Sequence, residues 1–240
     1  MKNIVIITAR SGSKGVPNKN IRKLGKVPLL GWVTSAAGNA KSVDKIILST
    51  DSEEYFKVAK KINKDVLWHK RSKELSEDVP SELVLLAVLE EFAHLFEQDS
   101  FLILIQPTTP FVSSTDIEKC ISLLKDHPDI NTCISVKQVS EQPEWMIART
   151  IDNIGSCRDL AGDISVRQNL QQRWIANGGV YVIRRRFLEE KRKVIDESKT
   201  LIYEMPKIRS MDIDHEDDFI ICESLVIVVR LFHHHDTEIL

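Results

Sequence analysis

The sequence lacks several features that would place it in a specialised class of protein. It has only four cysteines in 240 residues, and no two of them show the C-x-x-C spacing of a redox or zinc motif. No apolar stretch approaches the ~20 residues that a membrane span needs, and the start shows no leader with a cleavage site. We therefore expect a reduced, cytoplasmic protein with unpaired thiols and no membrane partner.

The sequence also lacks a strong charge of one sign. Its formal net charge is −2, and aromatic residues make up 6% of the chain, without the interleaving of aromatic and basic residues that favours nucleic acid. These numbers argue against a nucleic-acid partner. The histidine run at 233–235 is interpreted as a solvent-exposed tail, because three adjacent histidines on one element converge poorly on a metal ion. The length suits one α/β domain with an insertion.

Strand-like and helix-like segments alternate along most of the chain. Short apolar segments predict strands at 4–8, 46–50, 66–69, 101–105 and 132–136, with regular structure returning at 179–183. Segments with helical spacing or capping residues predict helices at 29–40, 53–62, 80–96, 113–125 and about 217–231. This alternation predicts an α/β fold with a doubly wound, mostly parallel sheet of Rossmann-like type.

A small, glycine-containing cationic loop follows the first predicted strand, at residues 9–20. Glycines allow backbone N–H groups to approach an anion, and Arg10, Lys14 and Lys19 add positive charge. Ligands of open α/β sheets bind at the carboxyl ends of strands, where this loop lies. The loop therefore predicts a polyphosphate site, although its spacing matches neither a Walker A motif nor G-x-G-x-x-G.

Two later segments carry further polar groups. In the Gln-Pro-Thr-Thr-Pro segment at 106–110, two prolines after a buried strand predict an extended turn that presents Gln106 and the threonine hydroxyls into a cleft. In the segment 211–214, Asp212 and Asp214 are two residues apart, so that on an extended strand they share one face. Such hard oxygen ligands suit Mg²⁺, while a solvent-exposed acidic turn continuing into 216–218 is the alternative.

Together with Asn-Gly-Gly-Val-Tyr at 177–181, these motifs resemble the CMP-sialic acid (acylneuraminate/legionaminate) cytidylyltransferase family over about residues 3–225. The resemblance implies a nucleotidyltransferase that couples CTP to a nine-carbon 2-keto acid sugar and releases pyrophosphate. It implies catalytic roles for Arg10, Lys14 and Lys19, and Mg²⁺ on Asp212 and Asp214. The implied nucleotide-binding residues are Ala9, Arg10, Gly12, Ser13, Lys19, Arg71 and Ser81. The implied sugar-binding residues are Gln106, Arg167, Gln168, Asn177 and Tyr181, of which Arg167 suits the sugar carboxylate.

The segment 138–174 is polar, with isolated apolar residues and little helical period. It is interpreted as an insertion between the two parts of the nucleotidyltransferase domain, 1–137 and 175–240. The resemblance implies that this insertion is a dimerisation arm, which reaches into a partner subunit and completes the active site of a homodimer. A surface excursion without such a role is the alternative.

The chain departs from the family pattern at a few positions. Val112 stands where many relatives have Arg, and Ile175 and Ala176 stand where many sialic acid enzymes have Arg and Pro. These losses put N-acetylneuraminate in doubt as the sugar and favour a legionaminate-type substrate. Activation of 3-deoxy-manno-octulosonate, and a catalytically inactive nucleotide-binding module, remain alternatives. No residue is assigned as the general base.

Overall fold

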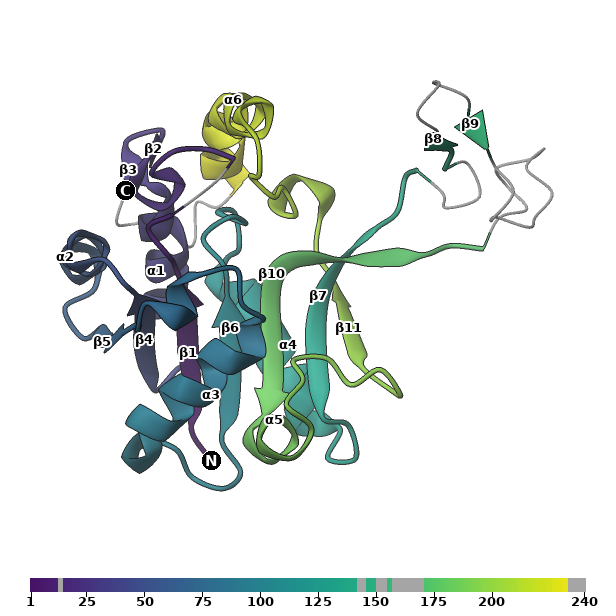
Figure 1. Cartoon of the computed structure of the whole chain (residues 1–240). Helices are drawn as coiled ribbons and strands as arrows, with labels where there is room; N and C mark the ends of the chain where they lie inside the picture. The colour runs from purple at the N-terminus through teal and green to yellow at the C-terminus, as the bar shows by residue number, and fades with distance from the viewer. Residues whose placement is uncertain (13–14, 142–145, 150–154, 157–170, 233–240) are drawn as a thin grey trace.

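The computed structural model describes residues 1–12, 15–141, 146–149, 155–156 and 171–232. A mixed seven-stranded sheet forms the centre of this part (Figure 1). Its strands are β1 (Asn3–Thr8), β4 (Lys45–Thr50), β5 (Leu67–Lys70), β6 (Phe101–Ile105), β7 (Thr132–Gln138), β10 (Trp174–Arg184) and β11 (Leu201–Glu204). Their order across the sheet is β11-β7-β10-β6-β1-β4-β5. Two short pairs, β2 (Lys23–Leu24) with β3 (Val27–Pro28) and β8 (Ala148–Arg149) with β9 (Gly155–Ser156), lie outside this sheet.

Most neighbouring strands run in parallel, which confirms the predicted fold class. β1 pairs in parallel with β4 and β6, and β4 pairs in parallel with β5. β10 is the exception, because it is antiparallel to both β6 and β7. The edge strand β11, parallel to β7, was missing from the sequence prediction, since its run Leu-Ile-Tyr is only three residues long.

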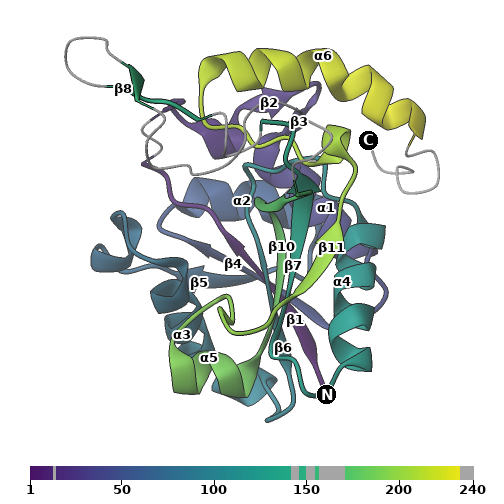
Figure 2. The same ribbon diagram turned by 90° about the vertical axis from the view of Figure 1, so that its right-hand side faces the viewer.

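Helices cover both faces of the sheet, as Figure 2 shows. Strand side chains alternate between the two faces, so that Val5 and Ile7 of β1 pack into one core cluster while Ile4 and Ile6 pack into another. The first cluster receives α1 (Leu29–Asn39), α2 (Glu53–Ile62) and α4 (Ser114–Asp126). The second receives α3 (Ser81–Glu91) and α5 (Arg185–Lys191). The single helix predicted at 80–96 is in fact α3, which ends at Glu91, followed by a separate short turn at Ala93–Leu95.

The last described helix, α6 (Glu216–Phe232), packs against the β2–β3 hairpin near the carboxyl ends of the central strands (Figure 2). Arg22 joins the two elements: its guanidinium donates two hydrogen bonds of 2.6 Å to the Glu216 carboxylate and lies 3.9 Å from the centre of the Phe219 ring. In the described part of the chain, no helix has the length and apolar character to cross a membrane.

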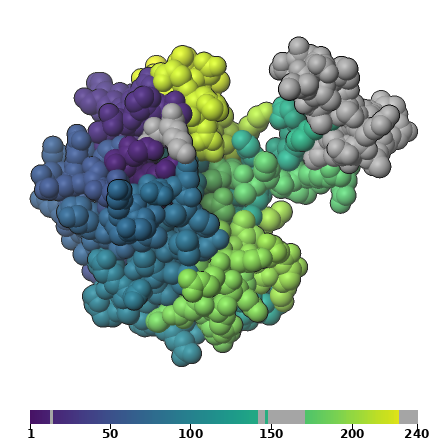
Figure 3. Space-filling view, in the orientation of Figure 1, coloured from purple at the N-terminus to yellow at the C-terminus, as the bar shows by residue number. Residues whose placement is uncertain are grey.

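β7 and β10 continue as a pair beyond the body of the sheet, and Figures 1 and 3 show this pair projecting from the molecule. Trp174 pairs with Gln138 and Ile175 with Lys137, before the register shifts between Ala176 and Tyr181. Both strands are thus longer than predicted, because backbone pairing carries them past the apolar segments. Most of the predicted arm at 138–174 lies outside the described residues, and its role stays a prediction.

Candidate functional site

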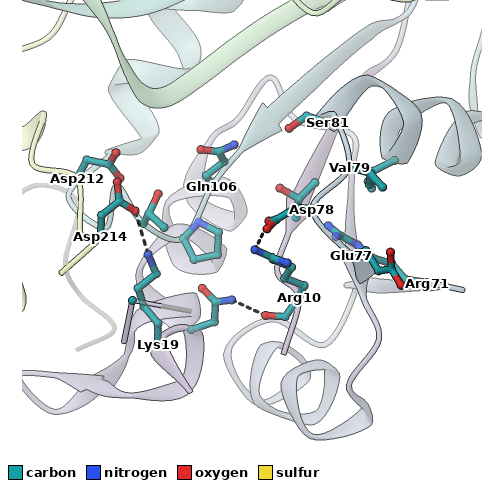
Figure 4. A pocket seen from close by; sticks show the side chains of 16 residues that line it. Arg10, Lys19, Arg71, Glu77, Asp78, Val79, Ser81, Gln106, Asp212 and Asp214 are labelled. Carbon is teal, nitrogen blue, oxygen red and sulfur yellow. Dashed lines mark hydrogen bonds and ion pairs between the residues drawn. The ribbon is translucent and has the colours of Figure 1, made fainter. Parts of the chain in front are cut away.

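A cavity of about 430 Å³ opens at the carboxyl ends of the parallel strands, where ligands of this fold class bind. Thr8 ends β1, Arg71 follows β5 and Gln106 follows β6. Several residues predicted from the sequence line this cavity: Arg10, Lys19, Arg71, Ser81, Gln106, Asp212 and Asp214. Figure 4 shows Lys19, Asp212 and Asp214 on one wall, Arg10, Asp78 and Arg71 on the opposite wall, and Gln106 between them.

Hydrogen bonds from the neighbouring strand hold the start of the cationic loop. The Ser11 backbone N–H and hydroxyl donate to the two carboxylate oxygens of Asp51, at 2.8 and 2.5 Å. The Asn20 side chain donates to the Arg10 carbonyl at 3.0 Å, and Asn18 adopts a left-handed conformation with φ of 52°. Asp51, which directly follows β4, thus fixes the start of this loop.

Lys19 joins the cationic loop to residues 211–214, the acidic segment that carries Asp212 and Asp214. Its side chain is largely buried, with the ammonium donating to the Ile213 carbonyl at 2.5 Å and to Asp214 at 3.2 Å (Figure 4). Gly15 also packs directly against Asp214, since a Cβ on Gly15 would lie 2.1 Å from the Asp214 backbone oxygen. Only glycine permits this packing, so loop and acidic segment form one wall of the cavity.

Asp212 and Asp214 lie in an extended connection and not in the strand that we predicted. The Ile213 backbone N–H between them donates to the Thr108 carbonyl at 2.8 Å. Burial raises the pKa of Asp212 above its ordinary value, although a hydrogen bond from the Thr108 hydroxyl acts in the opposite direction. Among the described residues, Asp212 Oδ1 is buried without a hydrogen-bond partner.

An unpartnered buried carboxylate oxygen fits a cation ligand, because buried polar atoms are otherwise satisfied. Within the described part, no cluster of three or more His, Cys, Asp or Glu side chains could hold a metal ion. A pair of carboxylates nevertheless suits Mg²⁺, which keeps several waters and takes one or two protein carboxylates together with substrate phosphates. The residues present therefore fit the predicted ion.

The opposite wall carries two arginines. The Arg10 guanidinium forms an ion pair with Asp78. Arg71 is buried at the cavity edge, and burial lowers its pKa to about 10; the nearby Arg10 acts in the same direction and Asp51 opposes it. Arg71 therefore remains cationic at neutral pH. Ser81 begins α3 beside them.

Some predicted residues do not face the cavity. Ala9 is buried in the core and donates its backbone N–H to Ser49, while Gly12 is exposed and a Cβ on it would meet nothing within 4 Å. Tyr181 packs against a core cluster, and burial raises its pKa, with Asp212 contributing. Of the two threonine hydroxyls predicted to face the cleft, Thr109 instead donates to the Asn177 carbonyl at 3.1 Å.

Asn177 is directed into the protein, with 2% of its surface exposed. Its side-chain oxygen accepts from Ser135 at 2.6 Å and from the Gly179 backbone at 3.1 Å, while its amide nitrogen donates to Ser210 at 2.9 Å. These bonds brace the turn at Gly178, whose φ is +74°. Asn177 thus has a structural role inside the protein, and its burial does not support the predicted sugar contact.

Several predicted residues cannot be compared with the structure, and several residues that line the cavity were not predicted. Ser13, Lys14, Arg167, Gln168 and the histidine run at 233–235 lie outside the described residues. Val112 is buried in the core, and the preference for a legionaminate-type sugar that was argued from it stays a prediction. Sequence reasoning did not assign Thr8, Asn20, Glu77, Asp78, Val79, Val84 or Pro107, which also line the cavity. Asn20 directly follows Lys19 in the loop motif, which was the available signal for it.

The arrangement of strands and helices is shared with a solved structure of another protein. A solved structure of a CMP:2-keto-3-deoxy-manno-octonic acid synthetase in complex with CTP superimposes with a TM-score of 0.68 over 95% of this chain and 99% of that chain. At 16% sequence identity, the likeness concerns the fold.

The family itself follows from the sequence comparison. The profile of the cytidylyltransferase family matches residues 4–177, and the chain belongs to this family. It is 32% identical over 225 residues to an N-acylneuraminate cytidylyltransferase of Streptococcus agalactiae serotype V, covering 92% of this chain and 52% of that protein. It is 29% identical over 232 residues to a CMP-N,N'-diacetyllegionaminic acid synthase of Legionella pneumophila, covering 94% and 97%. The chain thus spans about half the length of the first relative and nearly all of the second.

Proposed function

We propose that this protein is a cytidylyltransferase that couples CTP to a nine-carbon 2-keto acid sugar of the N-acetylneuraminate or legionaminate type. One observation carries the proposal: the cavity brings a cationic loop residue, Lys19, against two carboxylates, Asp212 and Asp214, at the carboxyl ends of the strands. This combination suits a metal-bound triphosphate. Membership of the cytidylyltransferase family and the two relatives named above support the nucleotide and the class of sugar.

The nucleotide lies between the two walls. Lys19 on one wall, Arg10 on the other and the backbone amides of the loop hold the phosphates, with Lys14 adding charge. Arg71 and Ser81 lie on the same wall as Arg10, and the planar fork of Arg71 suits the carbonyl acceptor of the cytosine. Arg10 is paired with Asp78 and Lys19 with Asp214, so phosphate oxygens replace carboxylate partners as the nucleotide binds.

Asp212 and Asp214 are the residues that would hold Mg²⁺. When bound, the ion supplies positive charge that neutralises the triphosphate and lowers the pKa of a hydroxyl close to it. In the reaction, the anomeric hydroxyl oxygen of the sugar attacks the α-phosphorus in line. A new phosphorus–oxygen bond forms, the bond to the bridging oxygen breaks, and pyrophosphate leaves while the hydroxyl proton passes to solvent or a base that we do not assign.

The cationic residues act on the charge that this step develops. Fixed donors aimed at the phosphoryl oxygens need no rearrangement during the reaction. One such donor lowers the activation barrier by on the order of 3–4 kcal/mol. Gln106 follows β6 and lies between the walls, and we propose it as a contact of the sugar. Arg167 and Gln168 remain proposed sugar contacts from the family resemblance, whereas the packing of Tyr181 against the core does not support the contact predicted for it.

We further propose that the enzyme is a cytoplasmic homodimer. Trp174 and Ile175 support the dimer, because they are 39% and 53% exposed on the projecting pair of strands and exposed apolar groups mark contact surfaces when they gather. In this proposal the arm of one subunit reaches the active site of the other.

Pyrophosphate release tests the proposal and separates its alternatives. The full chain is incubated with CTP and Mg²⁺ and with N-acetylneuraminate, legionaminate or 3-deoxy-manno-octulosonate. We expect the greatest release with one of the two nine-carbon acids, and legionaminate is our first choice of the two. Release chiefly with octulosonate would keep the enzyme class and change the sugar. Measurable CTP binding without release from any acceptor would instead favour an inactive nucleotide-binding module.

A further inference from the structure

A buried polar network lies behind the arginine wall of the cavity. Ser49 of β4 and His69 of β5 are neighbours in the parallel register, and 0% and 3% of their surfaces are exposed. Arg71 follows β5 two residues after His69, and its backbone N–H donates to the Thr50 carbonyl at 3.1 Å. The reaction proposed above uses neither Ser49 nor His69. Polar side chains buried so deeply need a partner or a function.

The hydrogen bonds of this network run in one direction. Arg71 Nε lies 2.9 Å from Ser49 Oγ and donates to it, because a guanidinium has no acceptor. Ser49 Oγ also lies 2.8 Å from His69 Nδ1. Since the hydroxyl accepts from Arg71, its single proton is free to be donated to Nδ1. His69 then carries its own proton on Nε2, which lies 3.6 Å from the Glu91 carboxylate.

The charge of His69 agrees with this arrangement. Burial lowers the pKa of His69 to about 4, and the nearby Arg71 guanidinium acts in the same direction. The imidazole is therefore neutral at physiological pH and offers Nδ1 as an acceptor. A protonated ring would lose that acceptor and would place a second positive charge beside Arg71.

We propose that Ser49 and His69 are positioning residues, which hold the Arg71 guanidinium at the cavity wall in the orientation that receives the nucleotide. This inference rests on the nucleotide site proposed above. Nε is held from behind by Ser49, and NH1 lies 3.5 Å from the Leu75 carbonyl, so the orientation of the fork is set before any ligand arrives. Such preorganisation strengthens binding because fewer side-chain rotamers are lost when the ligand binds.

The test is the dissociation constant for CTP, measured by isothermal titration calorimetry on the full chain. Ser49→Ala and His69→Leu should each raise it about tenfold, since each breaks the chain of hydrogen bonds that ends at the charged Arg71 guanidinium. His69→Asn keeps an acceptor near the position of Nδ1 and should restore most of the affinity. Thr50→Ala is the matched control: it removes an equally buried hydroxyl on β4 that accepts from the Ser52 backbone and not from Arg71.

A double-mutant cycle separates positioning from a general structural role. If Ser49 acts through Arg71, then Ser49→Ala adds no loss of CTP affinity to Arg71→Ala. A further loss in the double variant, or CTP affinity in Ser49→Ala and His69→Leu equal to that of Thr50→Ala, would overturn the inference. Two other results would refute the proposed nucleotide site itself and not the positioning role: a wild-type chain that does not bind CTP, or an Arg71→Ala variant that binds CTP as tightly as wild type.

One measurement needs no substitution and covers the case in which these variants do not fold. In the NMR spectrum of the wild-type protein without nucleotide, the Arg71 Nε–H signal should be sharp and slow to exchange with water. The His69 nitrogen shifts should report a neutral ring protonated on Nε2. An Arg71 Nε–H that exchanges as fast as those of exposed arginines would contradict preorganisation.

Discussion

At the scale of single residues, the account depends most on Lys19. Its ammonium is bound to the Ile213 carbonyl and to Asp214 at the cavity wall, where it can transfer to a phosphate. Lys19→Ala should lower kcat by about 10²–10³, the usual effect of removing one fixed donor, while the melting temperature changes little by comparison. Lys23→Ala, which removes an exposed lysine from the nearby hairpin, is the matched control and should leave kcat unchanged. Steady-state kinetics and thermal melts compare them, and equal kcat values in the two variants would count against the phosphate site.

Asp212 leads to a prediction of opposite effects on stability and on metal binding. Burial raises its pKa in the folded state, so the ionised form opposes folding, and this cost grows as the pH rises above the unfolded value of 3.8. Asp212→Asn should therefore raise the melting temperature at pH 7. The same variant should lose the additional stabilisation that CTP with Mg²⁺ gives over CTP alone.

Asp217→Asn provides the comparison, because Asp217 is exposed in the first turn of α6. It should change neither the melting temperature nor the response to Mg²⁺. An Asp212→Asn variant that melts below wild type, or that still responds to Mg²⁺, would refute the proposed role of the orphaned carboxylate oxygen.

At the scale of elements, the cationic loop and the acidic segment are packed as one unit, and Gly15 is where they touch. A Cβ at Gly15 would meet the Asp214 backbone oxygen at 2.1 Å, so Gly15→Ala must push the two apart. We expect a loss of about 1–3 kcal/mol in the free energy of unfolding, as for other overpacked sites. Gly12→Ala, with nothing within 4 Å of its Cβ, should show no such loss. Urea unfolding measures the free energy of unfolding of both variants. Equal free energies for Gly15→Ala and Gly12→Ala would mean that the loop is not packed as described.

A buried ion pair anchors the other end of the acidic segment to α4. Asp116 is fully buried and accepts from Arg209 at 2.7 and 3.1 Å and from the Tyr203 hydroxyl at 3.0 Å. Arg209→Ala would leave a buried charge with fewer partners, at a cost of about 3–5 kcal/mol in unfolding free energy. Lys57→Ala, which breaks the exposed pair with Glu53, should cost under about 1 kcal/mol. Comparable losses for the two variants in urea unfolding would contradict the anchoring role.

Sequence patterns predicted elements better than their arrangement. The strand Phe101–Ile105 and the helix Glu53–Ile62 were predicted to the residue, because a buried apolar run and a Ser-capped first turn are local signals. The reversal of β10 and its insertion between β6 and β7 have no local signal, since strand direction depends on how the whole chain is connected. The path of the acidic segment also escaped prediction, because it is set by contacts with residues distant in sequence, Thr108 and Lys19.

The candidate site shows the same division. Charged residues in the loop and the acidic segment were predicted to meet, and they line one cavity. Asn177 was assigned to the sugar from its motif, but Ser135, Gly179 and Ser210 satisfy its amide inside the protein. Which way an amide side chain turns depends on partners that are distant in sequence. Thr8 and Asp78 were given no role, although Thr8 directly precedes the loop and Asp78 lies between Arg71 and Ser81 in the sequence.

At the scale of the whole molecule, the central claim is that this cavity directs attack on the α-phosphorus of CTP. The most direct measurement is a phosphorus NMR time course with the full chain, CTP, Mg²⁺ and a nine-carbon 2-keto acid sugar. The account predicts that the triphosphate signals give way to one phosphodiester signal and to pyrophosphate in equal amounts. Conversion of CTP to CDP and inorganic phosphate, or an unchanged triphosphate with the nucleotide bound, would contradict it.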